Sequence, residues 1–382
     1  MNLFPKPAAA ALGGLLIVAL SSCGAPGEDD SSSGSDSGPI KFAVVNAQSG
    51  QLSSLGAWEL KGVKLAVNEF NAAGGVDGRK VELTVYDDQG DPTTGTSIAR
   101  KVVGGGYVAM MGTAESAVTQ AMNPILRQAK IPSITSGQSP AISALGSPFQ
   151  FLNGPTSVTY DETLVKYLVE TKKFTTFAMI TNNGGFGSGE RKAFTAALKA
   201  RGITPTDDKV VTTDQKDFSS ILTSIRTKKP QALFIGAEEV EAGLIAKQAR
   251  ELGLASVFVG AAPLATPVYV ETAGAANAEG SIVSTPYLSN DATAESKKFA
   301  DAYQKAYGEA AELHGAKAYD GATIFLTALK ATGGKGGQEL ADEIRRTKHA
   351  GLLGDFAFDD TGVGIHETQI GLIKNGTLVA AE

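Results

Sequence analysis

The feature that most constrains this fold is a regular alternation of strand-type and helix-type segments along most of the chain. Ile40–Val45 is a short apolar run, and the segment after Gly56 repeats apolar residues at spacings of three and four, as a helix does. Lys80–Asp87 is strand-like, and Asp91-Pro92 marks a helix start, with an N-cap followed by proline. Such alternation predicts parallel sheets with helices on both faces.

The same pattern predicts many further elements. The expected strands are Tyr107–Met111, Ile131–Thr135, Phe174–Ile180, Val210–Thr212, Ala232–Ile235, Ser256–Gly260 and Ser281–Ser284. The expected helices are Ser116–Lys130, Ser188–Arg201, Phe218–Thr227, Val240–Leu252, Ala292–Gly308, Ala316–Thr332 and Gln338–Thr347. These are too many for one compact sheet, and 382 residues fit two domains better than one. We therefore predict an α/β protein of two similar lobes, each a doubly wound parallel sheet.

The chain is expected to cross between these lobes three times, near Gly154–Thr156, Thr285–Pro286 and Gly351–Gly354. The first lobe then consists of 40–155 and 286–351, and the second of 156–285 and 352–382. In open α/β sheets ligands bind beyond the carboxyl ends of the strands. The loops that directly follow the strands are therefore the ones to search for a site.

The first 23 residues have the organisation of a secretory signal peptide. Lys6 supplies the positive charge, Ala8–Leu20 carries no polar side chain, and small residues follow up to Cys23. The apolar run is shorter than the roughly 20 residues that span a bilayer, so a permanent transmembrane helix is the weaker interpretation. The order Leu-Ser-Ser-Cys resembles the bacterial lipobox, which implies lipidation of Cys23 and cleavage before it. An ordinary signal peptide with an incidental cysteine is the alternative.

Composition narrows the possible partners. Residues 24–39 are mostly small, polar and acidic, so we expect a flexible tether there. The net charge of −6 argues against nucleic acid as a partner. One cysteine excludes an internal disulfide, and with only three histidines a zinc site is not expected.

Two neighbouring loops offer groups that bind anions. Ser116 follows a predicted strand and opens a helix, where a hydroxyl and free backbone amides hold a carboxylate or phosphate well. A plain helix cap is the alternative for this residue. The next strand is followed by Ser136-Gly137-Gln138-Ser139, which adds hydroxyl groups next to the first loop in sheet order. Together the loops indicate a site for a small anionic group.

Patterns of catalysis and cofactor binding are not found in the sequence. It contains no G-x-S-x-G elbow, no H-E-x-x-H and no Walker motif. The glycine-rich loop Asn182–Gly189 does not fit the dinucleotide fingerprint. Asp87, Asp88 and Asp91 lack the spacing of a calcium loop, and Asp91 is already explained as a cap. We expect no enzyme, no cofactor and no metal ion.

The order of segments resembles the leucine/isoleucine/valine-type solute-binding proteins of ABC importers. Four stretches carry the resemblance: Ile40–Val45 with Ser49-Gly50, the string from Asn68 to Arg79 (NEFNAAGGVDGR), Tyr86-Asp87-Asp88 with Asp91-Pro92, and Ala318–Ala322 (AYDGA). The resemblance covers nearly the whole chain after the leader. It implies the type I periplasmic binding fold, in which two lobes joined by three crossovers close on one small ligand.

The resemblance also implies which residues hold the ligand. In this family the α-carboxylate and α-ammonium of an amino acid are held by first-lobe loops, and the matching positions here are Ser116, Gly137 and Ser139. Leu55 matches another cleft position and adds an apolar wall. Trp58 is interpreted as helix packing or cleft rim.

The second lobe departs from the family pattern. Phe186 keeps the aromatic ring expected after the glycine turn but lacks a phenol hydroxyl. Glu238 stands where the family has another aromatic residue, and Ala262 stands where an acidic residue pairs with the ammonium. A buried ammonium without a counter-charge is costly. Two alternatives follow: Glu238 supplies the carboxylate from the neighbouring loop, or the ligand has no ammonium.

The sequence therefore predicts a lipid-anchored, extracytoplasmic protein on the outer face of the bacterial membrane. It is expected to act as a monomer that captures a small carboxylate, above all an aliphatic or branched-chain amino acid, for an ABC permease. Binding of an aromatic or other non-amino carboxylate, or of an amide, is one alternative. A sensor that reports the ligand to a membrane receptor is another.

Overall fold

The computed structural model describes residues 38–289 and 293–381, and the predicted leader, Cys23 and most of the predicted tether lie outside these ranges. The first sheet is fully parallel, with the strand order β2-β1-β3-β4-β5. Its strands are β1 (Ile40–Val45), β2 (Val81–Tyr86), β3 (Ala109–Met111), β4 (Ser133–Thr135) and β5 (Gln150–Leu152). Its helices are α1 (Ser53–Ala72), α2 (Pro92–Gly104), α3 (Ser116–Gln128), α4 (Pro140–Ser143), α12 (Leu313–Ala331) and α13 (Gly337–Arg346).

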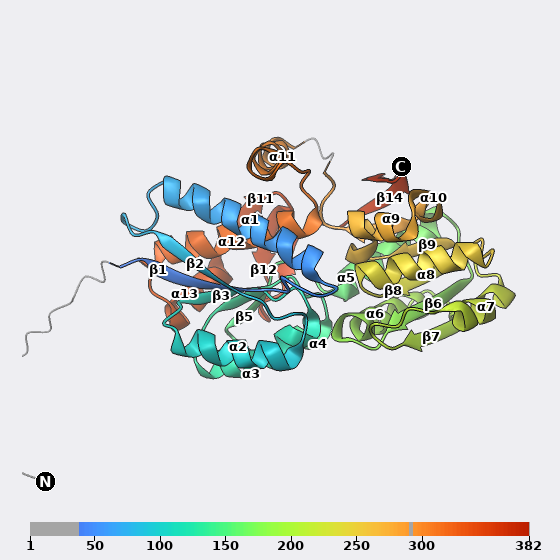
Figure 1. Ribbon diagram of the computed structural model, residues 1–382, viewed down its shortest axis with the longest axis horizontal. Coiled ribbons are helices and arrows are strands. Elements are labelled where there is room, and N and C mark those ends of the chain that lie inside the picture. Colours follow the sequence, from blue (N-terminus) through green and yellow to red (C-terminus); the bar gives the residue numbers. More distant parts are fainter. Residues whose placement is uncertain (1–37, 290–292, 382) are drawn as a thin grey trace, which may run out of the picture. The chain divides into compact units, whose positions relative to one another are not determined.

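Alternating side chains of β1 show why helices cover both faces of this sheet. Phe42 and Val44 pack in one apolar core with residues of α1 and α12, whereas Ala43 and Val45 pack in another with residues of α2 and α3. Successive residues of a strand point to opposite faces, so a strand that is apolar at every position needs cover on both sides. Figure 1 shows these helices on the two sides of the first sheet.

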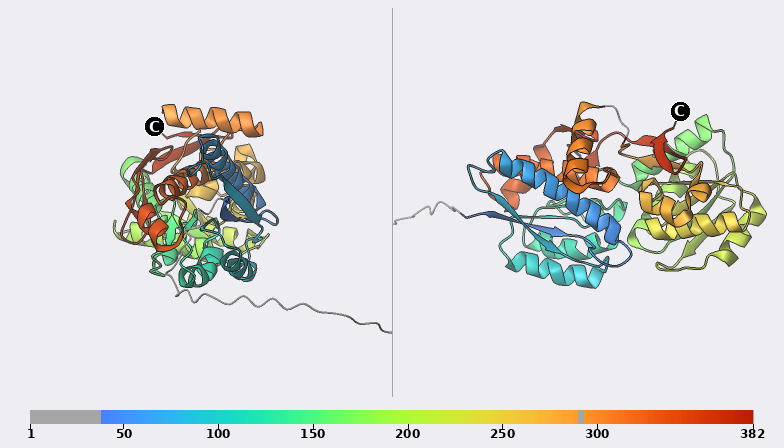
Figure 2. Two further views of the ribbon diagram at one scale, coloured as in Figure 1. Left: turned by 90° about the vertical axis from the view of Figure 1, so that its left-hand side faces the viewer. Right: turned by 45° about the horizontal axis from the view of Figure 1, so that its top comes forward.

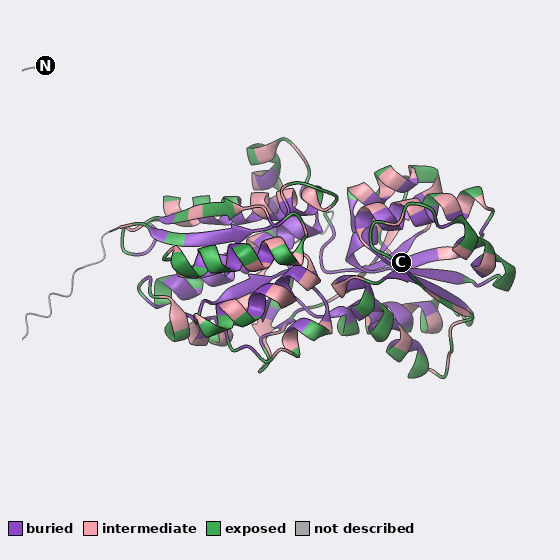
Figure 3. Cartoon of the chain, turned by 60° about the horizontal axis from the view of Figure 1, so that its bottom comes forward, coloured by how far each residue is buried: buried purple, intermediate pink, exposed green. Residues whose placement is uncertain are grey.

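The second sheet has seven strands in the order β15-β14-β10-β9-β8-β6-β7. Its five parallel strands are β6 (Phe177–Asn182), β7 (Asp207–Val211), β8 (Ala232–Gly236), β9 (Val257–Gly260) and β10 (Ile282–Thr285). β14 (Gln369–Lys374) and β15 (Thr377–Ala380) are antiparallel additions at one edge. Figure 3 shows the buried inner strands between their helices: β6, β8 and β10 are buried at every position, whereas the edge strands β7 and β15 are partly exposed.

Helices also lie on both faces of the second sheet, as the turned view in Figure 2 shows. Phe177 and Met179 face a core that includes α5 and α6, and Ala178 and Ile180 face a core that includes α7, α8 and α9. The elements of this part are α5 (Ser157–Lys166), the π-turn Tyr167–Thr171, α6 (Gly185–Lys199), α7 (Ser219–Lys228), α8 (Glu239–Glu251), the 3₁₀ turn Ala262–Ala265, α9 (Pro267–Ala273) and α10 (Ala275–Ala278). The predicted class, two parallel-sheet lobes of α/β type, is confirmed.

The end of the first lobe differs from the prediction. A small antiparallel sheet is formed by β11 (His349–Gly351), β12 (Gly354–Phe358) and β13 (Gly364–Ile365). Phe356 of β12 packs in the core of the first sheet, and the Leu152 amide donates to the Gly362 carbonyl at 2.9 Å. Residues 354–365 therefore lie with the first lobe, although 352–382 was assigned to the second. Short strands between glycine turns give too weak a pattern to be recognised from sequence.

A helix near the second connection, α11 (Ala294–Tyr307), packs against the first lobe. The Tyr307 hydroxyl donates to the carbonyl of Lys61 in α1 at 2.8 Å, and the ring of Phe299 lies 4.9 Å from that of Tyr319 in α12. The predicted capping of α2 is also confirmed, because the Asp91 side chain accepts from the Thr94 amide at 2.7 Å.

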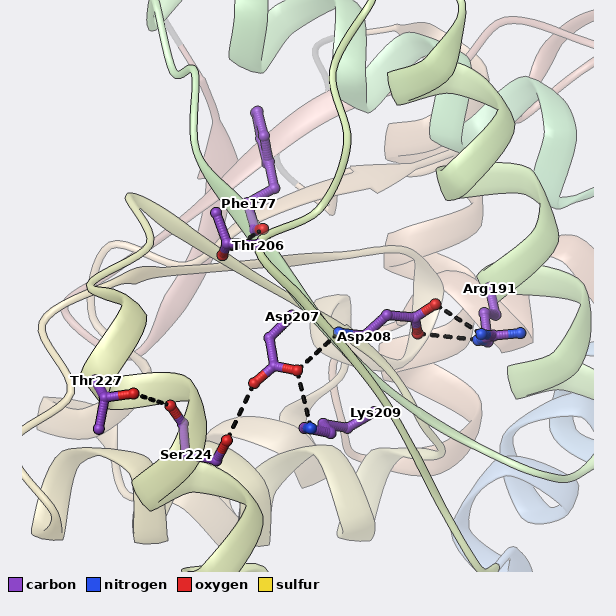
Figure 4. A network of polar contacts seen from close by, with 8 residues as sticks. All are labelled: Phe177, Arg191, Thr206, Asp207, Asp208, Lys209, Ser224 and Thr227. Atoms are coloured by element: carbon purple, nitrogen blue, oxygen red, sulfur yellow. Dashed lines mark hydrogen bonds and ion pairs between the residues drawn. The ribbon is translucent and has the colours of Figure 1, made fainter.

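The edge strand β7 is held by charged side chains on its surface. Arg191 of α6 donates to both carboxylate oxygens of Asp208, at 2.9 and 2.7 Å. Asp207 lies 3.0 Å from the Lys209 ammonium and accepts from the Ser224 hydroxyl at 3.3 Å (Figure 4). Charges along an exposed edge hinder pairing with another chain.

Candidate ligand-binding site

The two first-lobe loops named from sequence meet in the structure. Ser116 and Ser139 are both almost fully buried, and the Ser139 amide donates to the Ser116 hydroxyl at 3.4 Å. Gly137 fits between them because it has no side chain: an added Cβ would lie 3.2 Å from the Ser116 hydroxyl oxygen and 2.9 Å from Ile142. The loops after β3 and β4 thus form one polar surface at the carboxyl end of the first sheet.

A chain of threonine hydroxyls, not anticipated from sequence, fixes these loops. The Thr119 hydroxyl contacts those of Thr113 and Thr135 at 2.8 and 2.9 Å, and the Gly137 amide donates to the Thr135 hydroxyl at 3.0 Å. All three threonines are buried, so these hydrogen bonds are shielded from water. These threonines lie in a loop, in α3 and at the end of β4, and form no sequence motif, so only the fold identifies them.

The helix cap differs from the prediction. Glu115, and not Ser116, is the N-cap of α3, and its carboxylate accepts from the Val118 amide at 2.8 Å. Ser116 is the first helical residue, so its hydroxyl is not used as a cap. The Ser116 hydroxyl accepts only the long hydrogen bond from the Ser139 amide, but the helix amides that were expected to hold an anion are already bound by Glu115. Burial raises the pKa of the Glu115 carboxyl to about 7.

The glycine-rich turn at the start of α6 approaches these loops from the second lobe. An added Cβ at Gly185 would lie 2.7 Å from the Ala117 amide nitrogen, so glycine permits this close contact between α6 and α3. Gly189 approaches Ser139 in the same way, with 3.0 Å from an added Cβ to the hydroxyl oxygen. Phe186, in the first turn of α6, is 7% exposed.

Glu238 faces the first lobe across a cavity. It is the N-cap of α8, where its side chain makes no capping hydrogen bond. Burial and the carboxylates of Glu239 and Glu115 raise the pKa of Glu238 well above its usual value. The cavity has a volume of about 440 Å³. Its lining from the first lobe is Gly50, Gln51, Leu52, Gln89, Gly90, Pro92, Glu115 and Ala117, and its lining from the second is Gly184, Thr213, Asp214, Glu238, Val240 and Glu241.

Polar contacts join the two lobes at the rim of this cavity. Gln51 donates to Asp214 and accepts from the Lys216 ammonium at 2.7 Å. The acidic residues on the cavity wall outnumber the basic ones, since none of the lining residues is lysine or arginine. A larger cavity of about 870 Å³ lies between α3, α4, α5 and α6. Ser139 lies on its wall, and most of its lining residues are small.

The remaining two predicted residues lie in different surroundings. Leu55 is buried in the first turn of α1, 7% exposed. Ala262 is buried among apolar residues of the second-lobe core, including Phe258 and Leu264. The structure thus brings Ser116, Gly137 and Ser139 together, places Glu238 on the wall of the 440 Å³ cavity, and places Ala262 in an apolar core cluster.

Sequence reasoning missed a buried charged cluster next to these residues. Glu59 of α1, Glu239 of α8 and His314 of α12 are 2%, 3% and 6% exposed, and His314 Nε2 lies 3.4 Å from Glu239 Oε1. Lys317 is also buried; its ammonium donates to the Ser136 carbonyl at 3.2 Å, and burial lowers its pKa to about 8. One sequence signal was available: Glu59 follows Leu55 by four residues and therefore lies on the same face of the helix as this predicted cleft residue.

A second buried group of acids lies where the chain enters the second lobe. Asp161 of α5 and Glu190 of α6 are fully buried, and the Ser157 hydroxyl donates to Glu190. Both carboxylate oxygens of Asp161 lack a hydrogen-bond partner among the described residues. Burial raises the pKa of both carboxyls, and the charge of Glu190 raises that of Asp161 further.

Within residues 38–289 and 293–381, no group of three or more histidine, cysteine, aspartate or glutamate side chains is arranged to hold a metal ion. In the same ranges no helix has the length and apolar character needed to span a bilayer.

Two sheets whose strands end at a shared, polar cavity define a two-lobed binding protein. Residues 39–377 match the periplasmic binding protein family. The Leu/Ile/Val-binding protein of Escherichia coli K12 is 31% identical over 250 residues, which cover 65% of this chain and 67% of that protein. The Leu/Ile/Val-binding protein homolog 3 of Brucella melitensis is 26% identical over 331 residues, which cover 85% of this chain and 88% of that protein.

Solved structures show the same fold. The branched-chain amino acid transporter substrate-binding protein LivJ of Streptococcus pneumoniae, in complex with isoleucine, superposes with a TM-score of 0.83 at 26% identity, covering 90% of this chain and 99% of that one. A benzoate-bound solute-binding protein of R. palustris superposes with a TM-score of 0.81 at 20% identity, and the match covers 90% of this chain and 95% of that one. The chain belongs to the Leu/Ile/Val-binding protein family of ABC transporter solute-binding proteins, with the type I periplasmic binding fold. It is accordingly a binding protein and not an enzyme, as the sequence predicted.

The buried acids Asp161 and Glu190 generate a prediction about stability and pH. The native pKa of Glu190 is raised to about 7 and that of Asp161 well above its usual value, whereas both lie near 4 in the unfolded chain. Above about pH 4 the native state therefore holds more protons than the unfolded chain, up to about pH 7 for Glu190. The free energy of unfolding therefore falls across this range. Asp161→Asn keeps the shape without the charge and should raise the free energy of unfolding at pH 8 by about 1–3 kcal/mol, with little effect at pH 4.

Calorimetric unfolding at pH 4, 6 and 8 checks this prediction. Asp360→Asn, at an exposed position, is the matched control and should follow the parent protein at each pH. A loss of stability in Asp161→Asn at pH 8 would contradict the interpretation.

Proposed function

We propose that this protein captures a small amino acid between its lobes and delivers it to an ABC permease. Two observations carry the proposal: the loops with Ser116, Gly137 and Ser139 lie against the start of α6 in the other lobe, and Glu238 of that lobe lies on a cavity wall opposite Glu115 and Ala117. Hydroxyl and amide groups on one side and a carboxylate on the other suit the two charged groups of an amino acid. The names of the relatives support it, since two are Leu/Ile/Val-binding proteins and one was solved with isoleucine.

The ligand carboxylate is assigned to the Ser116 hydroxyl and the loop 137–139. The Ser116 hydroxyl is not a cap and accepts only a long hydrogen bond, from the Ser139 amide at 3.4 Å. A ligand carboxylate would accept a shorter hydrogen bond from each of these groups. Because Glu115 already binds the amides at the start of α3, the hydroxyl and the second loop carry this role.

The ligand ammonium is assigned to Glu238. This carboxylate makes no hydrogen bond as a cap, and its neighbours Glu115, Glu239 and Glu241 are all acidic. A cation placed there relieves the repulsion that disfavours the charged form of Glu238. Ala262 supplies no charge, so Glu238 replaces the acidic residue that the family has at that position.

A non-amino carboxylate is the second candidate, and the apolar surroundings of Ala262 favour it. The benzoate-bound protein of R. palustris shares the fold and carries such a ligand. A thermal-shift screen that pairs each amino acid with its deaminated acid separates the two candidates, because a ligand at about 1,000 times its dissociation constant adds about 4 kcal/mol of stability.

Attachment to the outer face of the cell membrane through Cys23 is also part of the proposal. Cys23 ends a leader with a lipobox-like Leu-Ser-Ser-Cys order and is the single cysteine of the chain. Two acyl chains anchor a protein stably, whereas one is marginal. The acidic, polar segment 24–39 would then act as a tether between lipid and folded lobes, and the lobes would act as a monomer.

Replacement of the Ser116 hydroxyl tests the carboxylate site. Ser116→Ala should weaken the affinity for the tightest-binding amino acid about tenfold, because one hydrogen bond to a charged group is lost. The free energy of unfolding should change little. Titration calorimetry measures the affinity. Ser143→Ala, which removes a hydroxyl bound to the Pro140 carbonyl in the same lobe, is the control and should bind normally. Unchanged affinity in Ser116→Ala would remove this residue from the site.

Replacement of Glu238 tests the ammonium site. Glu238→Gln should weaken the best amino acid about tenfold or more and leave the affinity for its deaminated acid unchanged, since only the amino acid presents a cation. Glu251→Gln, at the exposed end of the same helix, is the matched control. Equal losses for both ligands would show that Glu238 does not meet the ammonium.

The proposed anchor is tested by fatty-acid labelling. Cys23→Ser should abolish incorporation of a labelled fatty acid and leave the leader uncleaved, because neither acylation nor the cleavage that depends on it can occur at serine. Gel mobility and the label on the immunoprecipitated protein show both effects, and Ser22→Ala serves as the control that keeps the cysteine. Fatty-acid label that persists in Cys23→Ser would contradict the anchor.

A further inference from the structure

The wall of the 440 Å³ cavity carries acidic residues from both lobes. Glu115 comes from the first lobe, and Asp214, Glu238 and Glu241 come from the second. Lysine and arginine are absent from the residues that line this cavity. Two lobes that meet here therefore present negative charge to each other across one space, without a basic residue on the wall between them.

Two of these four acids have side-chain or backbone partners within the second lobe or at the rim. Glu241 accepts from the backbone amide of Asp214 at 2.7 Å, and Asp214 accepts from the Gln51 side chain. Among the described residues, no cationic side chain and no side-chain donor is bonded to Glu115 or Glu238. These two carboxylates, one from each lobe, are the ones that a ligand can satisfy.

The start of α3 holds the carboxylate of Glu115 in place. This carboxylate accepts from the Val118 amide at 2.8 Å and also from the Ala117 amide. Its two oxygens offer about four lone-pair positions, so two hydrogen bonds leave capacity for a further donor. The helix amides thus orient Glu115 on the cavity wall without using all of its acceptor capacity.

Glu115 and Glu238 interact although they belong to different lobes. Burial, the charge of Glu239 and then the charge of Glu115 raise the pKa of Glu238. Burial also raises the pKa of Glu115 to about 7, and the nearby carboxylate of Asp88 adds to this shift. When both groups are ionised, closure of the lobes brings like charges together, and a cation placed between them removes that cost.

The position of Glu115 in the chain also suits an amino acid. Glu115 directly precedes Ser116, to which the ligand carboxylate is assigned. The ammonium and the carboxylate of an amino acid are attached to the same carbon atom, so adjacent residues are well placed to bind the two groups. Glu238 then meets the ammonium from the other lobe.

We propose that the α-ammonium of the ligand is held between Glu115 of the first lobe and Glu238 of the second, which makes Glu115 a further residue that selects amino acids. The inference deepens the proposed function and rests on it, because it takes the ligand to be an amino acid whose ammonium faces Glu238. An ammonium has three N–H donors, enough for carboxylates on two sides. Leu52, Pro92 and Val240 on the same wall remain for an aliphatic side chain.

Replacement of Glu115 tests the proposal on the full chain. Glu115→Gln removes the charge and keeps an oxygen that can accept from the Val118 amide. Titration calorimetry should show an affinity about tenfold or more lower for the tightest-binding of leucine, isoleucine and valine, and no loss of affinity for its deaminated acid. Glu82→Gln, at an exposed position of β2 in the same lobe, is the matched control and should bind both ligands normally. Thermal unfolding of both variants is measured alongside so that a folding defect is recognised.

A second measurement uses the unaltered protein. The N-methyl derivative of the same amino acid keeps the positive charge but has one N–H donor fewer and an added methyl group. Because carboxylates enclose the ammonium from both lobes, this derivative should bind about tenfold or more weakly than the parent amino acid. Equal affinity for the two ligands would overturn the proposal.

Glu238→Gln, measured in the same way, separates this inference from the proposed function. If Glu238→Gln loses affinity for the amino acid and Glu115→Gln does not, the inference is wrong and the proposed function stands. Equal losses for the amino acid and its deaminated acid in Glu115→Gln would leave this residue only its role as a helix cap. If the unaltered protein binds deaminated acids and no amino acid, the proposed function fails and the inference falls with it.

The double variant then shows whether the two carboxylates share one ammonium. Residues with a common partner are coupled, so the loss in the variant that combines Glu115→Gln and Glu238→Gln should differ from the product of the single losses by about threefold or more. A loss equal to that product would place the two carboxylates on separate groups and contradict the proposal.

Discussion

Parallel strands impose the constraint on which this molecule depends, because all carboxyl ends of a parallel sheet lie at one edge. Here both sheets turn that edge toward the same space. The loops after β3 and β4 place Ser116 and Ser139 at this edge of the first sheet, and the loop after β8 places Glu238 on the wall of the 440 Å³ cavity. The helices that follow these strands begin at the same edge, so carboxylates such as Glu115 and Glu238 sit at helix N-termini, where the helix dipole favours negative charge.

Much of the fold could be predicted from the sequence, since strand-and-helix periodicity is a local property. Patterns of a few residues predict where α2 and α3 begin, after Asp91 and after β3. They also predict the alternation of strands and helices through both lobes. β12 could not be predicted in its place, because its membership of the first lobe depends on Phe356 reaching a core built by distant strands. Short antiparallel pieces between glycines do not contain that information.

The site was predictable in position and only partly in chemistry. Ser116, Gly137 and Ser139 were found because their loops follow neighbouring strands, yet the role of Glu115 as the cap depends on backbone geometry that a sequence does not display. Glu59 and His314 were missed for another reason. Each is an ordinary polar residue on a helix, and only the packing of α1 against α12 and the approach of α8 make them buried neighbours.

The ring of Trp58 lies parallel to that of His314, with an interplanar angle of 3° and centroids 6.4 Å apart. It is the single tryptophan of the chain. Light absorbed selectively by indole is therefore absorbed at one known place, beside an imidazole whose contact with Glu239 joins the lobes. The molecule thus carries its own optical reporter at the boundary between its halves, and its emission records the arrangement of that boundary without any attached dye.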